Sequence, residues 1–317
     1  MAYNHEKYIA QTLQSFVEQK TTFPFEIVIH DDASTDSTAQ IIRQFEEKYP
    51  QLIQPIYQTE NQYSKNIKVS RTYLYPRATG KYIAFCEGDD YWIDPYKLQK
   101  QVDYMESHPN CTLCFTNGQC EKNGVLSGRV LPWVNWTKKA YIPGDADYNM
   151  GQMVLLDYVP TASLLFRTAH IQAAPALSPQ SFAGDTFLRL YLTSLGYAHC
   201  IDEDTCVYRF GVTGSVTTQW QQNAKKSVAF LDSMHALLDD MNAITENRYN
   251  TQIQEMKLRL DCKKLMAQRD FSSLRQKKFR KLHRSDGMAA YAKFLMHIYF
   301  PRIFLWLQAK KKGISGK

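Results

Sequence analysis

Two short apolar runs of this chain each lead into a pair of aspartates. Asp31 and Asp32 follow residues 25–29, and Asp89 and Asp90 follow a second such run. Short runs rich in β-branched residues, bounded by polar residues, are typical of buried strands. Adjacent carboxylates at a strand end are costly unless a cation or hydrogen-bond donors neutralise them. The pattern therefore predicts a sheet that gathers carboxylates at one edge.

Helical patterns alternate with these strands. Ile9, Leu13 and Phe16 recur on one helical face ahead of the first strand, and a second amphipathic stretch follows it up to Pro50. Residues 52–57 and 81–86 indicate further strands. Such alternation predicts an α/β fold with a mostly parallel sheet flanked by helices, and ligands in such sheets bind beyond the carboxyl ends of the strands. We expect both acidic pairs to meet there.

The pattern of residue types along the chain changes near Gln221. With 317 residues, 44% of them hydrophobic, the chain can bury one substantial core and still supply a smaller second unit. Beyond Gln221 the pattern is helical, without glycine until Gly287 and without proline until Pro301. We therefore predict one domain over residues 1–220 and a helical extension over residues 221–317.

The basic character of the chain is concentrated in its last part. Residues 263–317 hold 15 Lys or Arg and two Asp, a charge of +13, whereas the rest carries −6 within a total of +7. A basic, aromatic tail favours an anionic membrane surface as partner over nucleic acid, which we do not expect. Residues 288–307 are apolar but interrupted by Lys293 and Pro301, which favours an interfacial helix over a spanning one. Packing of this stretch against the domain is the alternative.

Seven irregularly spaced cysteines and a polar start predict a reducing compartment. We expect the protein to be cytoplasmic, with the basic tail favouring a peripheral position on the inner face of the cell membrane. Cys111 and Cys114 have metal-like spacing but no matching second pair, so core positions are expected. Trp92 is a candidate for stacking on a sugar ring, with simple packing as the alternative.

Four motifs occur in a characteristic order over roughly residues 1 to 215. They are Ala2-Tyr3-Asn4, the Glu-Ile-Val-Ile-His-Asp-Asp-Ala-Ser-Thr-Asp run of residues 26–36, the Ala-Thr-Gly-Lys-Tyr-Ile-Ala-Phe-Cys-Glu-Gly-Asp-Asp run of residues 78–90, and Gly184-Asp185. In these motifs together the chain resembles a family 2 glycosyltransferase, although each alone is weak. The resemblance implies a GT-A fold with a nucleotide-sugar half over about residues 1–118, an acceptor half over 119–220, and the basic helical extension beyond.

The resemblance also implies an activity and a binding site. The enzyme would be a metal-dependent, inverting hexosyltransferase that moves a sugar from a nucleotide-diphosphate donor, a UDP-sugar by default, to an acceptor hydroxyl. Tyr3 would pack on the nucleobase and Asp32 would accept a hydrogen bond from it. Asp89 would contact the ribose or the metal, Asp90 would ligate the Mg²⁺ or Mn²⁺ that holds the diphosphate, and Arg209 is the best candidate for a further diphosphate contact.

The catalytic base must be a separate group, because carboxylates bound to a metal are suppressed as proton acceptors. Asp185 opens a helical stretch over residues 186–195, where free N–H groups and the helix dipole favour an ionised carboxylate. On local grounds a plain helix N-cap is equally acceptable. The resemblance favours the base, since the family places it in such a motif ahead of a Leu-rich helix.

The family resemblance suggests synthesis of a bacterial surface polysaccharide or glycolipid, with a sugar or lipid-linked acceptor. Family members normally begin with an apolar strand ahead of the Tyr-Asn turn, whereas this sequence starts at Met1. We therefore expect a truncation of about six residues, which would leave neighbouring strands unpaired and part of the core open. The alternative function is a catalytically degenerate GT-A scaffold or adaptor that binds an anionic partner through its basic tail.

Overall fold

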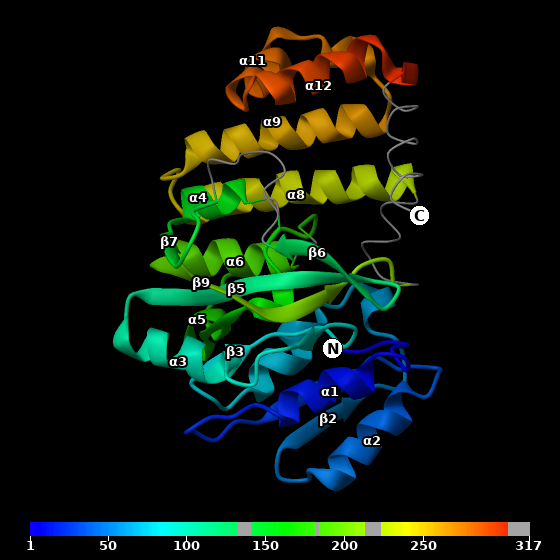
Figure 1. The fold of residues 1–317 in the computed structure, drawn as a ribbon, viewed down its shortest axis with the longest axis vertical. Coiled ribbons are helices and arrows are strands. Elements are labelled where there is room, and N and C mark those ends of the chain that lie inside the picture. Colours follow the sequence, from blue (N-terminus) through cyan, green and yellow to red (C-terminus); the bar gives the residue numbers. More distant parts are fainter. Residues whose placement is uncertain (132–140, 157, 182–183, 213–222, 304–317) are drawn as a thin grey trace.

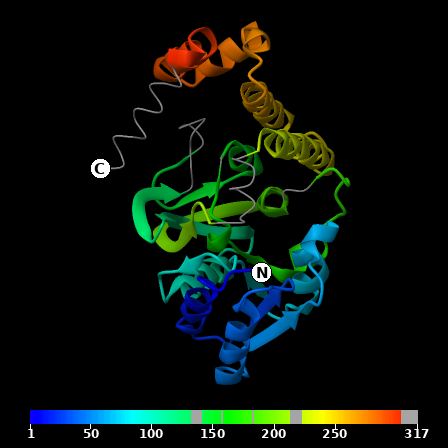
Figure 2. The same cartoon turned by 90° about the vertical axis from the view of Figure 1, so that its right-hand side faces the viewer.

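The chain is arranged in tiers along its longest axis (Figure 1). The computed structural model describes residues 1–131, 141–156, 158–181, 184–212 and 223–303. The N-terminal elements occupy the lower tier in Figure 1, two long strands cross the middle, and the C-terminal helices stack above them. Figure 2 shows from the side that the last helices lie at the end of the molecule opposite the N-terminal elements.

The lower tier is built around two parallel strands. β1 and β2 pair in register from Ile27 opposite Ile53 to Asp31 opposite Tyr57. Helices cover them because Ile9, Leu13 and Ile42 form an apolar face that is fully buried. The predicted order of helix, strand, helix and strand is confirmed, with these bounds: α1 (Ile9–Val17), β1 (Ile27–Asp31), α2 (Thr38–Lys48) and β2 (Ile53–Tyr57).

The middle tier is a mixed sheet. Its strands run in the order β3-β8-β5-β9-β4, with β6 added to β5 and β7 added to β9. Of these pairs only β5 and β9 run parallel; the other pairs are antiparallel. The bounds are β3 (Tyr82–Ala84), β4 (Tyr91–Trp92), β5 (Cys111–Lys122), β6 (Val125–Leu131), β7 (Ala146–Tyr148), β8 (Leu165–Arg167) and β9 (Tyr197–Arg209).

The sheet is therefore less parallel than the sequence predicts. The alternation of strands and helices holds only as far as α3 (Lys97–Ser107). After β5 the chain reverses at once at Asn123 and Gly124, whose φ angles of 53° and 77° suit a tight hairpin turn. Such a turn can join only antiparallel strands, whereas a parallel neighbour needs a long crossover.

A cavity of about 580 Å³ lies between β1 and β3 and is lined mainly by apolar side chains. On the edge of β1 that faces it, the described residues supply only a bridge from Ala2, whose N–H donates to His30 O (2.8 Å) and whose carbonyl accepts from Asp32 N (2.9 Å). Met1 O accepts from Gly88 N (2.9 Å). Met1 and Ala2 thus connect the two acidic loops.

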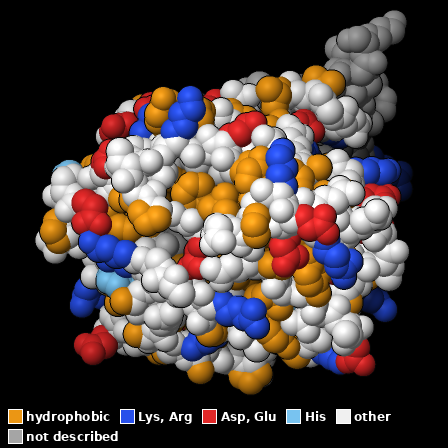
Figure 3. Space-filling view, turned by 90° about the horizontal axis from the view of Figure 1, so that it is seen from below, with side chains coloured by type: hydrophobic (Ala, Val, Ile, Leu, Met, Phe, Trp, Pro, Cys, Tyr) orange, Lys and Arg blue, Asp and Glu red, His pale blue; other side chains and the backbone are white. Residues whose placement is uncertain are grey.

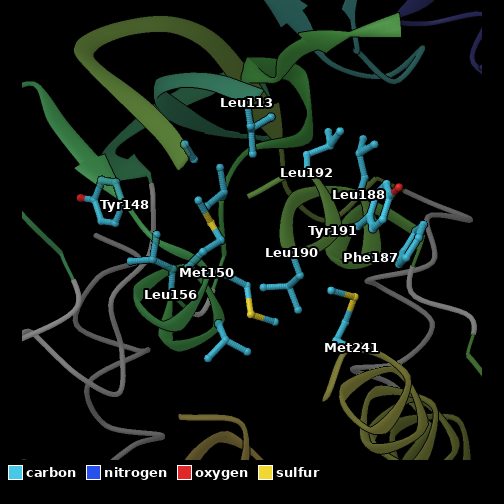
Figure 4. Packing of buried hydrophobic residues seen from close by; sticks show 14 of the residues in the cluster. Leu113, Tyr148, Met150, Leu156, Phe187, Leu188, Leu190, Tyr191, Leu192 and Met241 are labelled. Carbon is cyan, nitrogen blue, oxygen red and sulfur yellow. The ribbon is translucent and has the colours of Figure 1, made fainter. Parts of the chain in front are cut away.

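The upper tier contains the helical extension, which is packed onto the sheet layer. The predicted boundary near Gln221 lies outside the described residues, and α8 begins at Ala224. Side chains of α8, such as Leu237 and Met241, share one buried cluster with α4 and α6 (Figure 4). The helices are α4 (Met150–Leu155), α5 (Thr168–Gln172), α6 (Gly184–Ser194), α8 (Ala224–Ile244), α9 (Asn250–Ala267), α10 (Phe271–Leu274), α11 (Lys277–Ser285) and α12 (Met288–Tyr299). Among the described residues, no helix combines the length and apolar character needed to cross a membrane.

Cys111, Cys114 and Cys120 are buried on β5, as expected for core cysteines. Trp92 is also a packing residue: only 8% of it is exposed, and its indole N–H donates to Ala162 O (2.8 Å). Its ring faces the ammonium group of Lys97 at 4.6 Å, and Lys97 donates to Gln101 Oε1 (2.6 Å). Lys97 is fully buried at the start of α3, and among the described residues its ammonium group has no carboxylate hydrogen-bond partner.

We expect Lys97→Met to stabilise the protein at neutral pH. Burial lowers the pKa of Lys97 from 10.5 to about 8, so the unfolded chain binds more protons between these values and the wild type gains stability as pH rises through that range. At pH 7 the buried charge of Lys97 costs the folded wild type about 3 kcal/mol. The substitution removes this cost but also removes the hydrogen bond to Gln101, which is worth about 1 kcal/mol. Urea unfolding should show a gain of about 1–2 kcal/mol at pH 7 that shrinks toward pH 10.

The control for this prediction is Lys100→Met on the same helix. The Lys100 amine is partly exposed and bridges Asp94 (2.8 Å), so its removal should change the free energy of unfolding by less than about 1 kcal/mol. A Lys97→Met protein that is less stable than the wild type at pH 7 would contradict the prediction.

Candidate active site

The second acidic pair lies on a tight loop between β3 and β4. Gly88 is required there, because a Cβ would lie 2.8 Å from His5 Nδ1 and 2.9 Å from Met1 O. From α1, the Thr12 hydroxyl approaches the carbonyl oxygens of Gly88 (3.0 Å) and Asp90 (2.6 Å). The loop is thus held from both sides by contacts to its backbone, and these contacts do not involve its carboxylates.

Three carboxyl groups crowd this loop. Burial, with the charges of Asp89 and Asp185 adding to its effect, raises the pKa of Glu87 to about 8 against the opposing charge of the Met1 amine. Burial likewise raises the pKa of Asp90 well above its usual range, with Asp89 and Glu87 adding to the effect. Among the described residues, the buried Oε2 of Glu87 has no hydrogen-bond partner. The loop therefore concentrates carboxyl groups whose ionised forms are not fully stabilised by the described residues.

This arrangement fits a hard divalent cation. Carboxylate oxygens are the preferred ligands of Mg²⁺ and Mn²⁺, and an unpartnered buried carboxylate oxygen is a place where such an ion would relieve an energetic cost. Within the described ranges, no three His, Cys, Asp or Glu residues form a group that could hold an ion. That agrees with an ion that takes one or two carboxylates and completes its shell with water and phosphate oxygens.

Arg209 ends β9 and holds the acidic loop. Its backbone N–H donates to Asp90 Oδ1 (2.9 Å), and its Nη1 donates to the carbonyl oxygen of Asp89 (2.6 Å). Nε donates to Glu121 Oε1 (3.2 Å), and Nη2 donates to the side chain of Gln11. All three guanidinium nitrogens are engaged, and only 5% of the residue is exposed. A contact between Arg209 and the diphosphate stays a prediction, whereas its orienting role toward Asp89 and Asp90 is visible.

Two rings complete the surroundings of Arg209. The guanidinium lies 5.0 Å from the centroid of Tyr8 and 4.4 Å from that of Tyr91. Cation–π contacts of this kind retain the charge in a partly dry environment. The sequence places Arg209 after a strand; in the structure it is the last residue of that strand, and residues 213–215 of the following loop lie outside the described residues.

The first acidic pair forms the second part of the site. Asp32 is 2% exposed, and its carboxylate accepts the N–H groups of Gln62 (2.8 Å) and Tyr63 (3.0 Å). Its own N–H donates to Ala2 O, which places it beside Tyr3, whose side chain is 43% exposed. Asp32 therefore lies beside the turn that carries Tyr3, and the binding of a nucleobase by these two residues stays a prediction. A nucleobase at Asp32 would share oxygens that already hold the loop of Gln62 and Tyr63.

The turn that carries Tyr3 is tied to the loop after β1. Asn4 adopts a φ of 55°, its N–H donates to Ser34 Oγ (2.9 Å), and its side-chain oxygen accepts from Thr35 N (2.8 Å). Glu6 N donates to Asp36 Oδ2 (3.1 Å). The first and second sequence motifs thus form one rigid surface.

Asp185 lies in the first turn of α6 and is exposed. It sits inside the helix, which begins at Gly184, and not at the N-cap position that the sequence predicts. Its charge contributes to the raised pKa values of Glu87 and of the Tyr75 hydroxyl, for both of which burial is the main cause. The fold therefore brings Asp185 near the second acidic pair. The first pair, Asp31 and Asp32, is not among the charges that raise the pKa of Glu87.

Two residues of the site escape the sequence analysis. Glu87 directly precedes Gly88, so its place next to the acidic pair was a usable signal. Tyr158 has no such motif; burial raises the pKa of its hydroxyl, with Asp90, Glu87 and Asp185 among the contributing charges. Its ring lies 5.4 Å from that of Tyr208 on β9. Tyr158 thus lies between the acidic loop and α6, a position that only the tertiary structure reveals.

Known proteins share part of this sequence. A protein of Mycobacterium tuberculosis named "Uncharacterized protein Rv1520" is 36% identical to this chain over 169 residues. The match covers 53% of this chain and 45% of that protein. The UDP-Glc:alpha-D-GlcNAc-diphosphoundecaprenol beta-1,3-glucosyltransferase WfaP of Escherichia coli is 34% identical over 127 residues, or 40% of this chain and 47% of that enzyme. The matched segments span about half the length of these curated relatives.

Two solved structures show the same fold. Residues 1–349 of S. aureus TarS match with a TM-score of 0.50 and 18% identity, covering 93% of this chain and 88% of that one. The mannosyltransferase PcManGT from Pyrobaculum calidifontis, solved with GDP-Man and Mn²⁺, matches with a TM-score of 0.50 and 15% identity, covering 95% and 85%. The predicted GT-A fold is confirmed. Since the model of glycosyl transferase family 2 matches residues 1–172, more than half of the sequence, this chain belongs to that family of glycosyltransferases.

Proposed function

We propose that this glycosyltransferase moves a sugar from a nucleotide-diphosphate donor to an acceptor hydroxyl with inversion, in the synthesis of a surface polysaccharide or glycolipid. The observation that carries the proposal is the crowded acidic loop of Glu87, Asp89 and Asp90, with Asp185 within its electrostatic reach. WfaP is named as transferring glucose to a sugar linked to diphosphoundecaprenol, which supports a lipid-linked acceptor for this chain.

The donor side of the proposed site consists of Tyr3, Asp32 and the acidic loop. The exposed ring of Tyr3 would pack on the nucleobase next to Asp32. Asp89 and Asp90, with Glu87 beside them, would hold a Mg²⁺ or Mn²⁺ ion, and the Mn²⁺ and GDP-Man of PcManGT support this choice. When bound, such an ion stabilises the charge that develops on the leaving diphosphate. Arg209 keeps both aspartates in place while its own charge remains within the protein.

The acceptor side is centred on Asp185. Its carboxylate would remove the proton from the acceptor hydroxyl as that oxygen attacks the anomeric carbon from the face opposite the diphosphate. One displacement at that carbon inverts its configuration and needs no covalent sugar intermediate. The first turn of α6 favours the ionised carboxylate that a base requires, because its free N–H groups and the helix dipole stabilise negative charge.

The proposal is tested by nucleotide-sugar turnover. The purified protein is incubated with a panel of UDP-, GDP- and dTDP-sugars, Mn²⁺ or Mg²⁺, and an undecaprenyl-diphosphate sugar acceptor, and release of nucleoside diphosphate is measured. We expect release from one donor class, with UDP-sugars first, and its loss on addition of EDTA. If no donor turns over and no nucleotide binds, the degenerate scaffold is the better description of the protein.

A peripheral position on the cytoplasmic face of the membrane is part of the proposal. The exposed side of α12 is apolar at Met288, Met296 and Phe300. The exposed basic residues around it are Arg275, Lys277, Lys278, Arg280, Lys281, Arg284, Lys293 and Arg302. The opposite end of the molecule, seen in Figure 3, shows basic and acidic side chains interspersed. A basic surface with apolar side chains suits anionic lipid headgroups.

We expect the wild type to float with vesicles of phosphatidylglycerol and phosphatidylcholine, and the double variant Lys278→Glu, Lys281→Glu to bind them at least tenfold more weakly. Each basic residue near such a surface contributes about 1 kcal/mol, so two reversals exceed this threshold. The matched control is Arg43→Glu, Lys48→Glu, two exposed residues of α2 at the other end of the molecule. Equal flotation of all three proteins would exclude this surface as the membrane contact.

A further inference from the structure

We infer that Asp240 of the helical extension is a positioning residue for sugar transfer, because it fastens the segment that leads into the helix of Asp185. The inference rests on the proposed function. It makes α8 part of the catalytic apparatus, although the sequence separates the extension from the domain that carries the site motifs.

A single oxygen of Asp240 gathers three donors from this segment. Asp240 Oδ2 accepts Ser178 N (3.0 Å), Ser178 Oγ (2.8 Å) and Ser181 Oγ (2.7 Å). Ser181 is 1% exposed, and its N–H donates to Ser178 O (3.0 Å), which closes a tight turn. Hydrogen bonds to a carboxylate are among the stronger ones in proteins. The turn is therefore fixed to α8 at one point.

The same segment is held from the opposite side by the N-terminal tier. Arg71, in the helical turn η2 (Ser70–Leu74), donates to Pro175 O (2.7 Å) and Ala174 O (2.6 Å). Lys68 Nζ donates to Ser181 O (2.9 Å). Residues 174–181 are thus held by two anchors, Asp240 on α8 and the Lys68 and Arg71 pair of the N-terminal tier. Neither anchor is close in sequence: Asp240 lies 62 positions from Ser178, and Arg71 lies 104 positions from Pro175.

What these anchors position is α6. The helix begins at Gly184, shortly after the anchored turn, and Asp185 is its second residue. Farther along, Leu188, Leu190 and Leu192 are buried in the cluster that α8 also enters (Figure 4). Most of α6 is thus held by packing, whereas its first two residues, Gly184 and Asp185, are exposed and follow directly on the segment that precedes the helix. A base displaced by about 1 Å can lose a hundredfold in rate, so fastening this turn matters for catalysis.

The test compares Asp240→Ala, Asp240→Asn and the neighbouring Asp239→Ala. Asp239 is an exposed residue of α8 that bridges Lys257 (2.6 Å), so its removal controls for loss of a charge from the same helix. We expect Asp240→Ala to lower kcat by roughly ten- to a hundredfold with KM for the donor unchanged, since Tyr3 and Asp32 belong to the lower tier. Asp240→Asn should recover part of kcat, because the amide oxygen can still accept two of the three bonds. Asp239→Ala should match the wild type.

Two further measurements separate this role from general stability. Amide hydrogen exchange should speed up over residues 174–181 and the first turn of α6 in Asp240→Ala, and not in α1 or β5. Binding of UDP and Mn²⁺, measured by calorimetry, should be unchanged. A normal kcat in Asp240→Ala, with or without faster exchange, overturns the inference while leaving the proposed function intact. A wild type that turns over no donor overturns the proposed function and, with it, this role.

Discussion

Asp185→Asn should lower kcat for sugar transfer by roughly 10²–10⁴-fold, the usual contribution of a general base. The amide keeps the size of the side chain but cannot take the proton from the acceptor hydroxyl. Asp185 is exposed in the first turn of α6, so the substitution should leave the fold unchanged. Initial rates at saturating donor, together with UDP binding by calorimetry in the presence of Mn²⁺, would show a loss in kcat without a loss in nucleotide affinity.

The control for this measurement is Asp103→Asn. Asp103 is an exposed aspartate on α3. Among the described residues, its carboxylate accepts a hydrogen bond from Gln99 alone (2.8 Å), so we expect Asp103→Asn to keep the wild-type kcat. If Asp185→Asn keeps kcat within about threefold of the wild type, Asp185 is not the base. Tyr158 and Glu87 would then be the next groups to replace, because both lie within electrostatic reach of Asp185.

The second large effect is expected at the acidic loop, where Asp89→Asn and Asp90→Asn should each lower metal-dependent turnover by about a thousandfold, a loss of roughly 4 kcal/mol in transition-state stabilisation. Asp90→Asn should fold normally. Burial already favours the neutral form of Asp90, which an amide resembles, and the amide oxygen can still accept from Arg209 N. Turnover is measured against Mn²⁺ concentration, with thermal unfolding as the check on folding.

The same loop predicts a pH dependence for Mn²⁺ binding. Because the pKa of Glu87 is raised to about 8, its carboxyl group holds a proton at neutral pH in the cation-free protein. A cation must displace that proton, so the apparent Kd for Mn²⁺ should fall as pH rises from 6.5 to 8.5 and level off above it. Glu87→Gln should flatten this dependence. Asp204→Asn on β9 serves as the control for the turnover measurement and for the Mn²⁺ titration. If Asp89→Asn and Asp90→Asn turn over the donor as fast as this control, the loop holds no catalytic metal.

Several features of the fold follow from local sequence patterns. The periodicity of Ile9 and Leu13 identifies α1, and the short apolar runs ahead of the two acidic pairs identify β1 and β3. The place of Asp185 at the start of a helix was also predictable, with an error of two positions in where the helix begins. These predictions succeed because a helix or a strand buries one face at a fixed period, which is a property of the sequence itself.

Other features were beyond local reasoning. The antiparallel pairing of β3, β4, β7 and β8 depends on which strand edges remain open after β5 and β9 have paired, and no window of sequence contains that information. The role of Arg209 has the same origin. Its position after a strand suggested a ligand contact, but its guanidinium group meets Gln11, which lies 198 positions away in the chain.

The sequence by itself determined the family, the strands and helices of the first tier, and the acidic residues that the site uses, because each depends on residue types at short, regular spacing. Only the tertiary structure decided that Glu87 shares the field of Asp89 and Asp185, that Arg209 orients the acidic loop, and that Asp240 fastens the segment before α6. Burial and electrostatic coupling govern these three features. Both depend on distances between residues far apart in the chain, and those distances exist only once the core has closed.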